Sequence, residues 1–484
     1  MNVPLSRKKM LIKIVAAGLL IAMMSTPSLA ATLGITKDGR FFTVDGRPTY
    51  LNGISYYSAL SLADPNQVRA DLNDMAADGF NWIRVWAHWN SEGDDICALN
   101  ADGKVREPYL SRLKSLVKMC NERKIIVDVT MARDRKQAFA GYLEGARALA
   151  RELKPCRNVY LDVGNERDVQ DNRYVSFEEI GELTRAIKEI DPKRICTASG
   201  VPGSQANLDQ YLKAGCDFIA PHLDRGQGSS AKTVGAIKEL IVWMNALNHR
   251  VPIHLQEPFR RGYTDYQPTV EDFFRDDSGG KIAGAAGWCL HNGSSRISKD
   301  HRPFRSFYMG GNEGRLYKQL DAVELEAAGG LDDQIGGTDM NTLRYQAEYE
   351  EQLSHETGRR QGFSWSASVG HDKAGFLSHG PGIDKISSGR VTWRLRVFGR
   401  ADHEPVLVLD IYSAGKVLAS KTVTRRDFSA PGKWQTFSLD FKGGKQALVF
   451  RTYWTGKADL EMDHLTLKIG NQTPGYVAIQ DIID

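Results

Sequence analysis

Two glutamates each follow a short apolar run, at a place where packing alone does not call for a carboxylate. Asn165 and Glu166 come just after the run Asn158–Val163. Glu257 directly follows the similar run Val251–Gln256 and lies 91 residues after Glu166. Both runs are rich in residues that favour β-strands, and nothing about packing a strand requires an amide and a carboxylate at its tip. Two carboxylates at the ends of two strands are the groups that cleave a glycosidic bond.

Cleavage of a glycoside requires the two carboxyl groups to differ in protonation state. Glu166, kept protonated by partial burial, could donate a proton to the leaving oxygen. Glu257, kept ionised by a cation such as Arg84, could attack the anomeric carbon. Asn165 could hydrogen-bond the sugar 2-hydroxyl, and Trp288 could form the floor under the apolar face of a sugar ring.

The elements that must position these residues lie between residues 31 and 320. Short apolar runs alternate with amphipathic ones, which is typical of βα units around a parallel sheet. Eight such repeats fit into about 270 residues, as in a (β/α)8 TIM barrel. A doubly wound open sheet is the alternative, but no glycine-rich phosphate loop follows the first strand. The expected strands are 51–55, 80–86, 125–129, 158–163, 194–198, 218–221, 251–256 and 284–290.

The carboxyl ends of the strands form one face of such a barrel, so the polar residues that follow the strands should meet there. Besides Asn165 and the two glutamates, the residues expected on this face are Arg84, His88, His222 and Trp288. Structural roles remain possible for each of them. The glutamates could be rim carboxylates paired with Arg167 and Arg260, the histidines could simply bond backbone, and Trp288 could be a core residue.

The first 30 residues have the pattern of a secretory signal peptide. Arg7, Lys8, Lys9 and Lys13 surround the start of an apolar stretch, Ile14–Met24, and small residues precede a cleavage site after Ala30. An uncleaved membrane anchor is the alternative, although the stretch is shorter than the roughly 20 residues of a membrane span. We therefore expect a periplasmic or extracellular protein without stable membrane insertion.

Loss of these residues would lower the formal charge from +4 to zero. A neutral mature chain offers no concentrated basic face, so nucleic acid is not an expected partner. The six cysteines, Cys97, Cys120, Cys156, Cys196, Cys216 and Cys289, could form disulfides in an oxidising compartment. Their spacing does not reveal a pairing, and we expect at most one or two bridges.

The character of the sequence changes after residue 320. Residues 304–320 are expected to form the last barrel helix, and the glycine- and aspartate-rich segment 321–340 an exposed linker. Alternating strands punctuated by glycine and proline then predict a β-sandwich over 341–470, followed by a poorly ordered tail, 471–484. A chain of 484 residues is long enough for such a barrel and a second domain.

Several motifs resemble those of the clan A glycoside hydrolases, most closely the cellulase- and mannanase-type family 5. They are Gly79–Trp86, Gly164–Glu166, Gln256-Glu257 and Gly287-Trp288, and the resemblance covers residues 31–320. It implies that Glu166 is the acid/base and Glu257 the nucleophile. It also implies hydrolysis of β-linked sugars with retention of configuration, without a metal or other cofactor.

Two positions depart from the family pattern. The Asn-Glu pair is usually followed by proline, whereas Arg167 follows it here. The family's His-x-Tyr motif, whose tyrosine hydrogen-bonds the nucleophile, reads His222-Leu223-Asp224 here. The sequence therefore does not identify the hydrogen-bond partner of the nucleophile.

The C-terminal domain resembles the jelly-roll carbohydrate-binding modules of families 6 and 35. The matching segments are Tyr345–Glu348, Gly389–Thr392 and Phe450–Trp454. Tyr453, Trp454 and Trp365 could stack on sugars.

The sequence thus predicts a secreted, retaining, endo-acting hydrolase of a polysaccharide. A catalytically inactive polysaccharide-binding protein of export or assembly is one alternative, and a transglycosylase that uses the same glutamates is another. The polysaccharide itself cannot be read from the sequence, because specificity lies in the loops.

Overall fold

The computed structural model describes residues 30–470, with short gaps. The gaps are residues 89, 92–93, 134–136, 172, 295–304, 308, 311–313, 385, 387, 400–401 and 444–445, and the side chains of 88, 90, 91 and 94. The predicted signal peptide up to residue 29 and the predicted tail, 471–484, lie outside the described residues.

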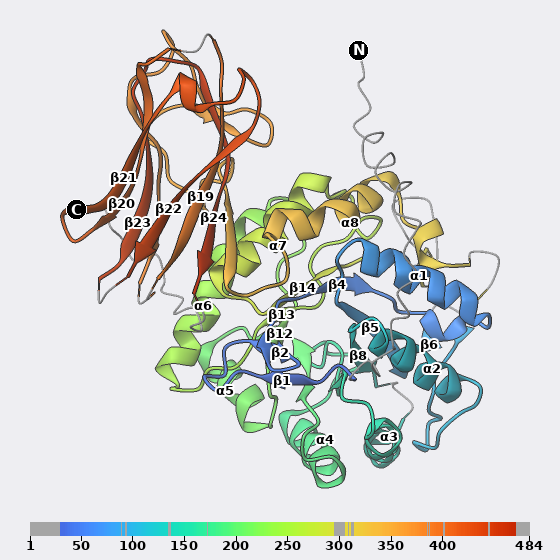
Figure 1. The fold of residues 1–484 in the computed structure, drawn as a ribbon. Coiled ribbons are helices and arrows are strands. Elements are labelled where there is room, and N and C mark those ends of the chain that lie inside the picture. Colours follow the sequence, from blue (N-terminus) through green and yellow to red (C-terminus); the bar gives the residue numbers. More distant parts are fainter. Residues whose placement is uncertain are drawn as a thin grey trace, which may run out of the picture.

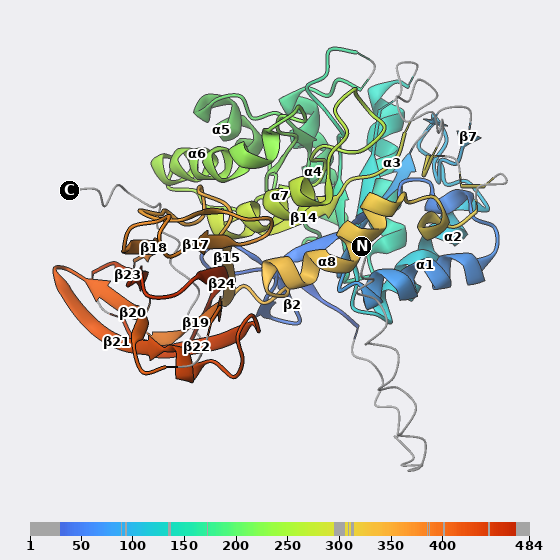
Figure 2. The same cartoon turned by 90° about the horizontal axis from the view of Figure 1, so that it is seen from above.

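The N-terminal domain is a curled parallel sheet surrounded by helices (Figures 1 and 2). Seven strands follow the order β10-β9-β8-β5-β4-β14-β13, and β11 pairs with β12 in parallel. A parallel bridge between Ile219 and Ile253 links the β12 end to β13 and closes the ring. The strands are β4 (Leu51–Ser55), β5 (Trp82–His88), β8 (Ile126–Met131), β9 (Val159–Asp162), β10 (Cys196–Thr197), β11 (Ser199–Gly200), β12 (Ala220–Pro221), β13 (His254–Leu255) and β14 (Gly287–Leu290). The predicted (β/α)8 barrel is confirmed.

Helices cover the outside of this sheet. They are α1 (Pro65–Ala77), α2 (Tyr109–Asn121), α3 (Phe139–Leu153), α4 (Phe177–Ile190), α5 (Gln205–Lys213), α6 (Thr233–Ala246), α7 (Val270–Ala283) and α8 (Ala322–Ile335). Short 3-10 turns are η1 (Ala59–Ser61), η2 (Ser229–Lys232), η3 (Leu316–Lys318) and, in the second domain, η4 (Arg425–Asp427). Local signals explain several helix starts. Ser176 and Glu179, for example, form a capping box at the start of α4.

Small antiparallel elements flank the barrel. Strands β2 (Phe42–Val44) and β3 (Arg47–Pro48) form a hairpin to which β1 (Leu33–Ile35) is paired, and β6 (Asn90–Ser91) pairs with β7 (Asp94–Asp95). Asp45 and Gly46 both have positive φ, 53° and 77°, as a tight hairpin turn requires. Phe42 packs against Phe218, which precedes β12, so the hairpin covers the amino ends of the barrel strands.

The prediction for the end of the barrel is wrong in two respects. Among the described residues of 304–320, the helical part is only η3. The supposed linker, 321–340, contains α8, whose residues Ala327 and Leu331 are fully buried. The helix forms because Asp321 and Glu324 make a capping box at its start.

The C-terminal domain consists of two antiparallel sheets that face each other (Figure 1). One has the order β16-β17-β24-β19-β22 with β15 also paired to β24, and the other has the order β18-β23-β20-β21. The strands are β15 (Thr342–Gln346), β16 (Arg359–Arg360), β17 (Trp365–Ala367), β18 (Gly375–Ile383), β19 (Ser388–Val397), β20 (Pro405–Ser413), β21 (Lys416–Thr424), β22 (Gln435–Lys442), β23 (Leu448–Trp454) and β24 (Leu460–Ile469). The predicted β-sandwich is confirmed.

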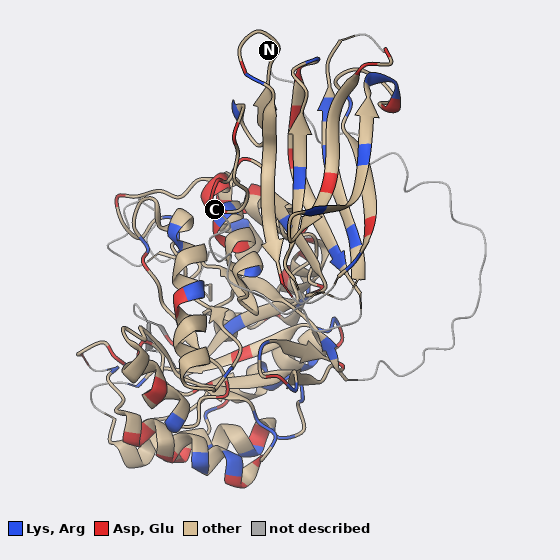
Figure 3. Ribbon diagram, turned by 90° about the vertical axis from the view of Figure 1, so that its left-hand side faces the viewer, with Lys and Arg blue, Asp and Glu red and all other residues tan. Residues whose placement is uncertain are grey.

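The sandwich is docked against helix α7 of the barrel. The guanidinium of Arg275 makes two hydrogen bonds to Glu351, of 2.6 and 2.7 Å. Gln352 donates to the hydroxyl of Ser278 at 2.9 Å, and Ile282 belongs to the apolar core of the sandwich. Basic and acidic residues are interspersed over both domains (Figure 3).

All six cysteines are free thiols, and only Cys156 is half-buried rather than buried. Within the described ranges, no helix combines the length and the apolar character needed to cross a membrane.

Candidate active site

The structure brings the two predicted glutamates together at the carboxyl ends of the barrel strands. Glu166 lies four residues beyond β9, and Glu257 lies two residues beyond β13. One carboxylate oxygen of each, together with a ring nitrogen of His222, lie within 4.8 Å of one another. Glu166 has a φ of 46°, a left-handed conformation that is uncommon for a residue other than glycine and often marks a functional site.

Arg84 on β5 joins these residues from the interior of the barrel, where it is fully buried. Its Nη1 donates to Glu257 at 2.5 Å, and its Nη2 donates to Asp162 and to the side-chain oxygen of Asn165, both at 2.9 Å. Its Nε lies 3.2 Å from Asp128. The predicted cation beside Glu257 is therefore present, and Asn165 is held by the same guanidinium.

Arg225 lies between the two glutamates and was not anticipated from the sequence. Its Nη2 donates to Glu257 at 3.0 Å and to Glu166 at 3.3 Å, and lies 3.2 Å from Nδ1 of His222. Arg173 donates to the other oxygen of Glu166 and pairs with Asp171 at 2.9 Å. A signal for Arg225 exists, because it follows His222 by three residues on the loop after β12.

These cations determine the charge of both carboxyl groups. Burial raises the pKa of Glu257, but His222, Arg84 and Arg225 outweigh burial and hold that pKa well below its ordinary value. Burial and the charge of Glu257 raise the pKa of Glu166, whereas His222 and Arg225 lower it, and the net pKa lies below its ordinary value. Both glutamates are thus ionised at neutral pH in this unliganded state. The prediction that partial burial keeps Glu166 protonated therefore does not hold for this unliganded state, because His222 and Arg225 outweigh burial.

The alternative ion pairs on the rim are not formed either. Arg167 donates to the carbonyl of Val175 at 2.9 Å, and its guanidinium lies 4.0 Å from the ring centre of Phe177. Its aromatic contacts, rather than Glu166, explain why a large cation can follow the Asn-Glu pair. Arg260, predicted as a possible partner of Glu257, contacts His291 instead.

The prediction for Trp288 is wrong. Its side chain is 0% exposed, and its indole nitrogen donates to Asp276 of α7 at 2.7 Å. The ring also packs edge-on against Phe273 of the same helix. Trp288 therefore belongs to the core between sheet and helices and offers no surface to a sugar. The side chain of His88, another predicted site residue, lies outside the described residues.

Two polar groups beside the glutamates are buried and lack a partner among the described residues. They are the hydroxyl of Tyr57 and Nε2 of His222. Tyr57 packs edge-on against Trp86 and His291. Buried polar atoms are normally satisfied, so such atoms in a site are suited to a ligand that carries several hydroxyl groups.

The carboxylates and His222 could in principle ligate a metal ion. However, Nη2 of Arg225 lies within 3.3 Å of all three side chains, and Arg84 holds the second oxygen of Glu257. A divalent cation would have to displace one guanidinium and approach another, which its charge opposes. The donor set therefore does not suit a metal.

The barrel followed by a β-sandwich is similar in fold to solved structures that are described as glycoside hydrolases. A structure described as a glycoside hydrolase matches 91% of this chain and 97% of its own, with 12% identity and a TM-score of 0.52. A family 5 glycoside hydrolase from Bacteroides vulgatus matches over 93% and 95%, with 13% identity and a TM-score of 0.52. Both alignments include the sandwich, and at these identities they establish the fold. No protein-family model and no curated protein matches the sequence.

Proposed function

We propose that the protein is a retaining glycoside hydrolase that cleaves β-linkages within a polysaccharide. The observation that carries this proposal is the approach of Glu166 and Glu257 to within 4.8 Å, with Arg84 on the second of them. Retaining enzymes hold their two carboxyl groups about 5–5.5 Å apart, whereas inverting enzymes need roughly 6.5–9.5 Å to admit a water molecule.

The two glutamates differ in a way that suits the two roles. Glu257 is the more buried, with 6% of its side chain exposed against 19% for Glu166, and its pKa is the more strongly lowered. A buried, ionised carboxylate is suited to attack the anomeric carbon. Glu166 is the more accessible and is suited to exchange protons with the leaving group and then with water.

The charge of Glu257 also provides a way to change the role of Glu166. That charge raises the pKa of Glu166, and it disappears when Glu257 forms a covalent bond to the sugar. Glu166 then becomes more acidic, as a residue that must act as a base in the second step requires. In the first step, a sugar bound between the carboxylates has to displace Arg225, whose loss raises the pKa of Glu166 further.

The experiment for this proposal is the release of reducing ends from a panel of β-glucans, β-mannans and acidic exopolysaccharides. Glu257→Gln and Glu166→Gln should each reduce hydrolysis by at least a thousandfold while the midpoint of thermal unfolding stays close to that of the wild type. Activity that survives in Glu257→Gln would exclude Glu257 as the nucleophile. Product analysis by NMR would show retention or inversion, and competing acceptors would reveal transglycosylation.

One observation favours a second candidate function, a polysaccharide-binding protein without turnover. Nη2 of Arg225 lies where the anomeric carbon of a substrate would have to pass between the glutamates. If Arg225 does not move, glycans are bound but not cleaved. Binding measured by calorimetry, without release of reducing ends from any glycan of the panel, would favour this function.

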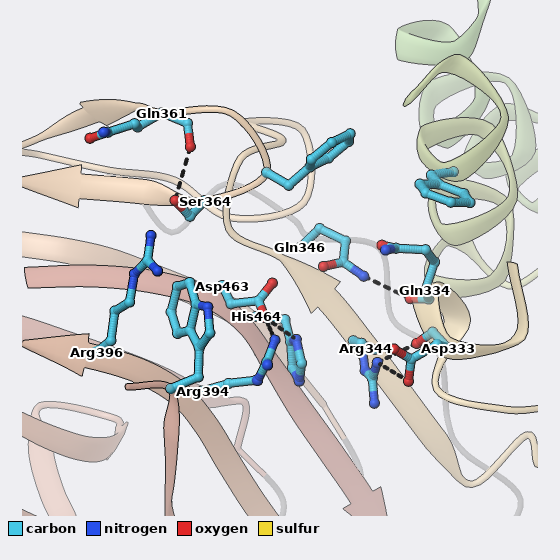
Figure 4. A pocket seen from close by; sticks show the side chains of 13 residues that line it. Asp333, Gln334, Arg344, Gln346, Gln361, Ser364, Arg394, Arg396, Asp463 and His464 are labelled. Atoms are coloured by element: carbon cyan, nitrogen blue, oxygen red, sulfur yellow. Dashed lines mark hydrogen bonds and ion pairs between the residues drawn. The ribbon is translucent and has the colours of Figure 1, made fainter. Parts of the chain in front are cut away.

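We propose further that the sandwich holds the polysaccharide at a cavity of about 340 Å³ at the domain junction. Figure 4 shows its lining, in which Asp333 and Gln334 of α8 lie across from Arg394 and Arg396 of the sandwich. Trp434 also lines it, with the two guanidinium groups 5.1 and 4.4 Å from its ring centre. An aromatic ring beside polar side chains is suited to a sugar. The domain would act in the periplasm or outside the cell, after loss of residues 1–30.

A further inference from the structure

Arg260 lies near the charge of the proposed nucleophile, Glu257, but forms no direct ion pair with it. It follows Glu257 by three residues, and no carboxylate of the described residues forms an ion pair with its guanidinium. Its one hydrogen bond among these residues joins Nη1 to Nε2 of His291, at 3.0 Å. By contrast, three other arginines of this site each pair with at least one carboxylate. They are Arg84, Arg173 and Arg225.

His291 does not compensate the charge of Arg260. Its Nδ1 lies 2.7 Å from the carbonyl of Pro258, so Nδ1 carries the proton and Nε2 accepts from Arg260. Burial and the neighbouring Arg260 hold the pKa of His291 well below its ordinary value, which keeps the ring neutral. The pair is therefore a cation hydrogen-bonded to a neutral acceptor.

The surroundings of Arg260 fix its orientation and leave the residue half-buried. Its guanidinium lies 4.3 Å from the ring centre of Tyr263 and 5.1 Å from that of Phe307. Its Nε is inaccessible to water and has no hydrogen-bond partner in the described part of the chain. Aromatic contacts attract a cation but do not neutralise it, and the nearest negative charge, that of Glu257, is already shared by Arg84 and Arg225. Such an arrangement is expected where an anion binds.

Arg225 is a second cation that needs an anion when substrate is bound. It is close enough to Arg260 for their charges to oppose each other: burial and Arg225 lower the pKa of Arg260, Tyr57 and Glu257 raise it, and the net pKa lies below its ordinary value. Its own charge is shared between Glu166 and Glu257. A sugar bound between the carboxylates separates Arg225 from both of them, and Arg225 then also needs an anion.

We propose that the substrate is an anionic glycan whose acidic substituent, on the sugar beside Glu257, pairs with Arg260 and draws Arg225 away from the two glutamates. This inference rests on the proposed glycosidase function and adds its substrate class. The substituent is a carboxylate, as in a uronic acid, or a sulfate ester, because both present the oxygens that a guanidinium binds. A neutral glycan leaves Arg225 in place between the carboxylates.

The test compares three sets of oligosaccharides with the full mature protein: β-linked uronic acids, sulfated β-glycans and neutral β-mannan or β-glucan. Binding is measured by calorimetry and cleavage by release of reducing ends, in wild type, Arg260→Gln and Arg261→Gln. Arg261 is the matched control, because its charge is already paired with Asp321 at 2.6 Å. Thermal unfolding shows whether each variant is folded, and Arg260→Lys retains the charge if the glutamine variant is not.

We expect the wild type to prefer an acidic glycan, with binding that weakens as salt is added. Arg260→Gln should weaken that binding roughly tenfold to a hundredfold, as expected for loss of a charged hydrogen bond. It should raise KM with kcat changed by less than about threefold, while Arg261→Gln stays within about twofold of the wild type. A preference for uronic acid over sulfate, or the reverse, identifies the substituent.

The outcomes separate this inference from the proposed function. Cleavage of neutral glycans with equal efficiency in wild type and Arg260→Gln overturns the acidic substrate and leaves the hydrolase standing. Binding of acidic oligosaccharides that depends on Arg260, without cleavage by the wild type, supports the inference and overturns hydrolysis. Equal binding of acidic and neutral oligosaccharides overturns the inference whether or not either is cleaved.

Discussion

Among single residues, Arg225 is one of the two, with His222, that lower the pKa of the proposed acid, Glu166. Its Nη2 lies 3.3 Å from Glu166 and contributes to the lowered pKa of that carboxyl. An acid/base of a retaining enzyme has to be protonated when the glycosidic bond breaks. The alkaline limb of kcat/KM therefore reports the pKa of Glu166 in the free enzyme.

Arg225→Gln should move this alkaline limb to higher pH. Removal of the guanidinium takes away a positive charge that stabilises the ionised form, so the pKa of Glu166 rises and the proton is retained to higher pH. The measurement is the pH dependence of kcat/KM on an oligosaccharide that the wild type cleaves. Arg133→Gln is the control, because Arg133 pairs with Glu179 at 3.0 Å and with neither Glu166 nor Glu257. An unchanged limb in Arg225→Gln would show that Arg225 does not lower the pKa of Glu166 in the free enzyme.

Glu348 permits a prediction about stability, because it is buried and its Oε2 has no hydrogen-bond partner among the described residues. Burial raises its pKa from 4.5 to about 8. The stability that comes from holding this proton is fully present below pH 4.5 and is lost as the pH rises through 8. Glu348→Gln mimics the protonated form. It should therefore unfold at a similar temperature to the wild type at pH 5 but at a temperature several degrees higher at pH 9. Equal melting temperatures at pH 9 would contradict the raised pKa.

Some of these residues could be predicted from the sequence and others could not, for a physical reason. Glu166 and Glu257 were found because they follow short apolar strands, whose ends meet in a barrel, and Arg84 was found because it is a charged residue within such a strand. Arg225 lies within a loop, whose path the sequence does not specify. Trp288 was misplaced because parallel barrel strands are apolar on both faces, so the pattern does not tell which residues point toward the helices.

At the scale of elements, glycine was the misleading signal at the end of the barrel. The segment predicted as a linker forms α8, in which two adjacent glycines have different surroundings. A Cβ on Gly330 would come within 2.5 Å of the Phe274 ring, whereas a Cβ on Gly329 would meet nothing within 4 Å. Gly330 is therefore needed for the close approach of α7 and α8, whereas Gly329 is not.

This contrast predicts opposite effects of the same substitution at neighbouring positions. Gly330→Ala should destabilise the protein by about 1–3 kcal/mol, because the Phe274 ring must move. Gly329→Ala should stabilise it by about 0.4–1 kcal/mol, because alanine favours helix and restricts the unfolded chain. Urea unfolding of both variants measures the two values. If both variants lost stability equally, the two helices would not pack as closely as described.

The buried face of helix α7 is not apolar along its whole length, because Asp276 and Asp277 interrupt the apolar pattern after Phe274. Both aspartates are nevertheless buried, with Trp288 donating to the first and Tyr50 to the second. Burial also raises the pKa of Asp276 to about 6. Helix lengths could therefore be predicted where the buried face is apolar, but not where it carries polar pairs that only the folded chain reveals.

At the scale of the whole molecule, the junction of the two domains could not be predicted, because each domain has its own periodic pattern. The sandwich was expected to bind sugar through Tyr453, Trp454 and Trp365. Trp454 is fully buried, and Trp365 stacks on His355 with ring centres 3.7 Å apart, so both are packing residues. Tyr453 is 37% exposed. Trp434, which the sequence analysis did not single out, lines the junction cavity instead.

The cavity and the exposed Tyr453 are therefore alternative places for the sandwich to hold a polymer, and one pair of variants separates them. Trp434→Ala should weaken binding to a cleavable polysaccharide about five- to thirtyfold, equivalent to about 1–2 kcal/mol, because it removes the aromatic wall of the cavity. Cleavage of short soluble oligosaccharides should be unchanged, since the lining residues belong to α7, α8 and the sandwich rather than to the strand ends. Tyr453→Ala should leave both properties unchanged.

Sedimentation with insoluble polysaccharide measures the binding, and release of reducing ends from soluble oligosaccharides measures the cleavage. If Tyr453→Ala alone weakened binding, the polymer would lie on the sheet that contains β23, which carries Tyr453, and not at the junction. The two domains would then bind glycan on surfaces that do not meet.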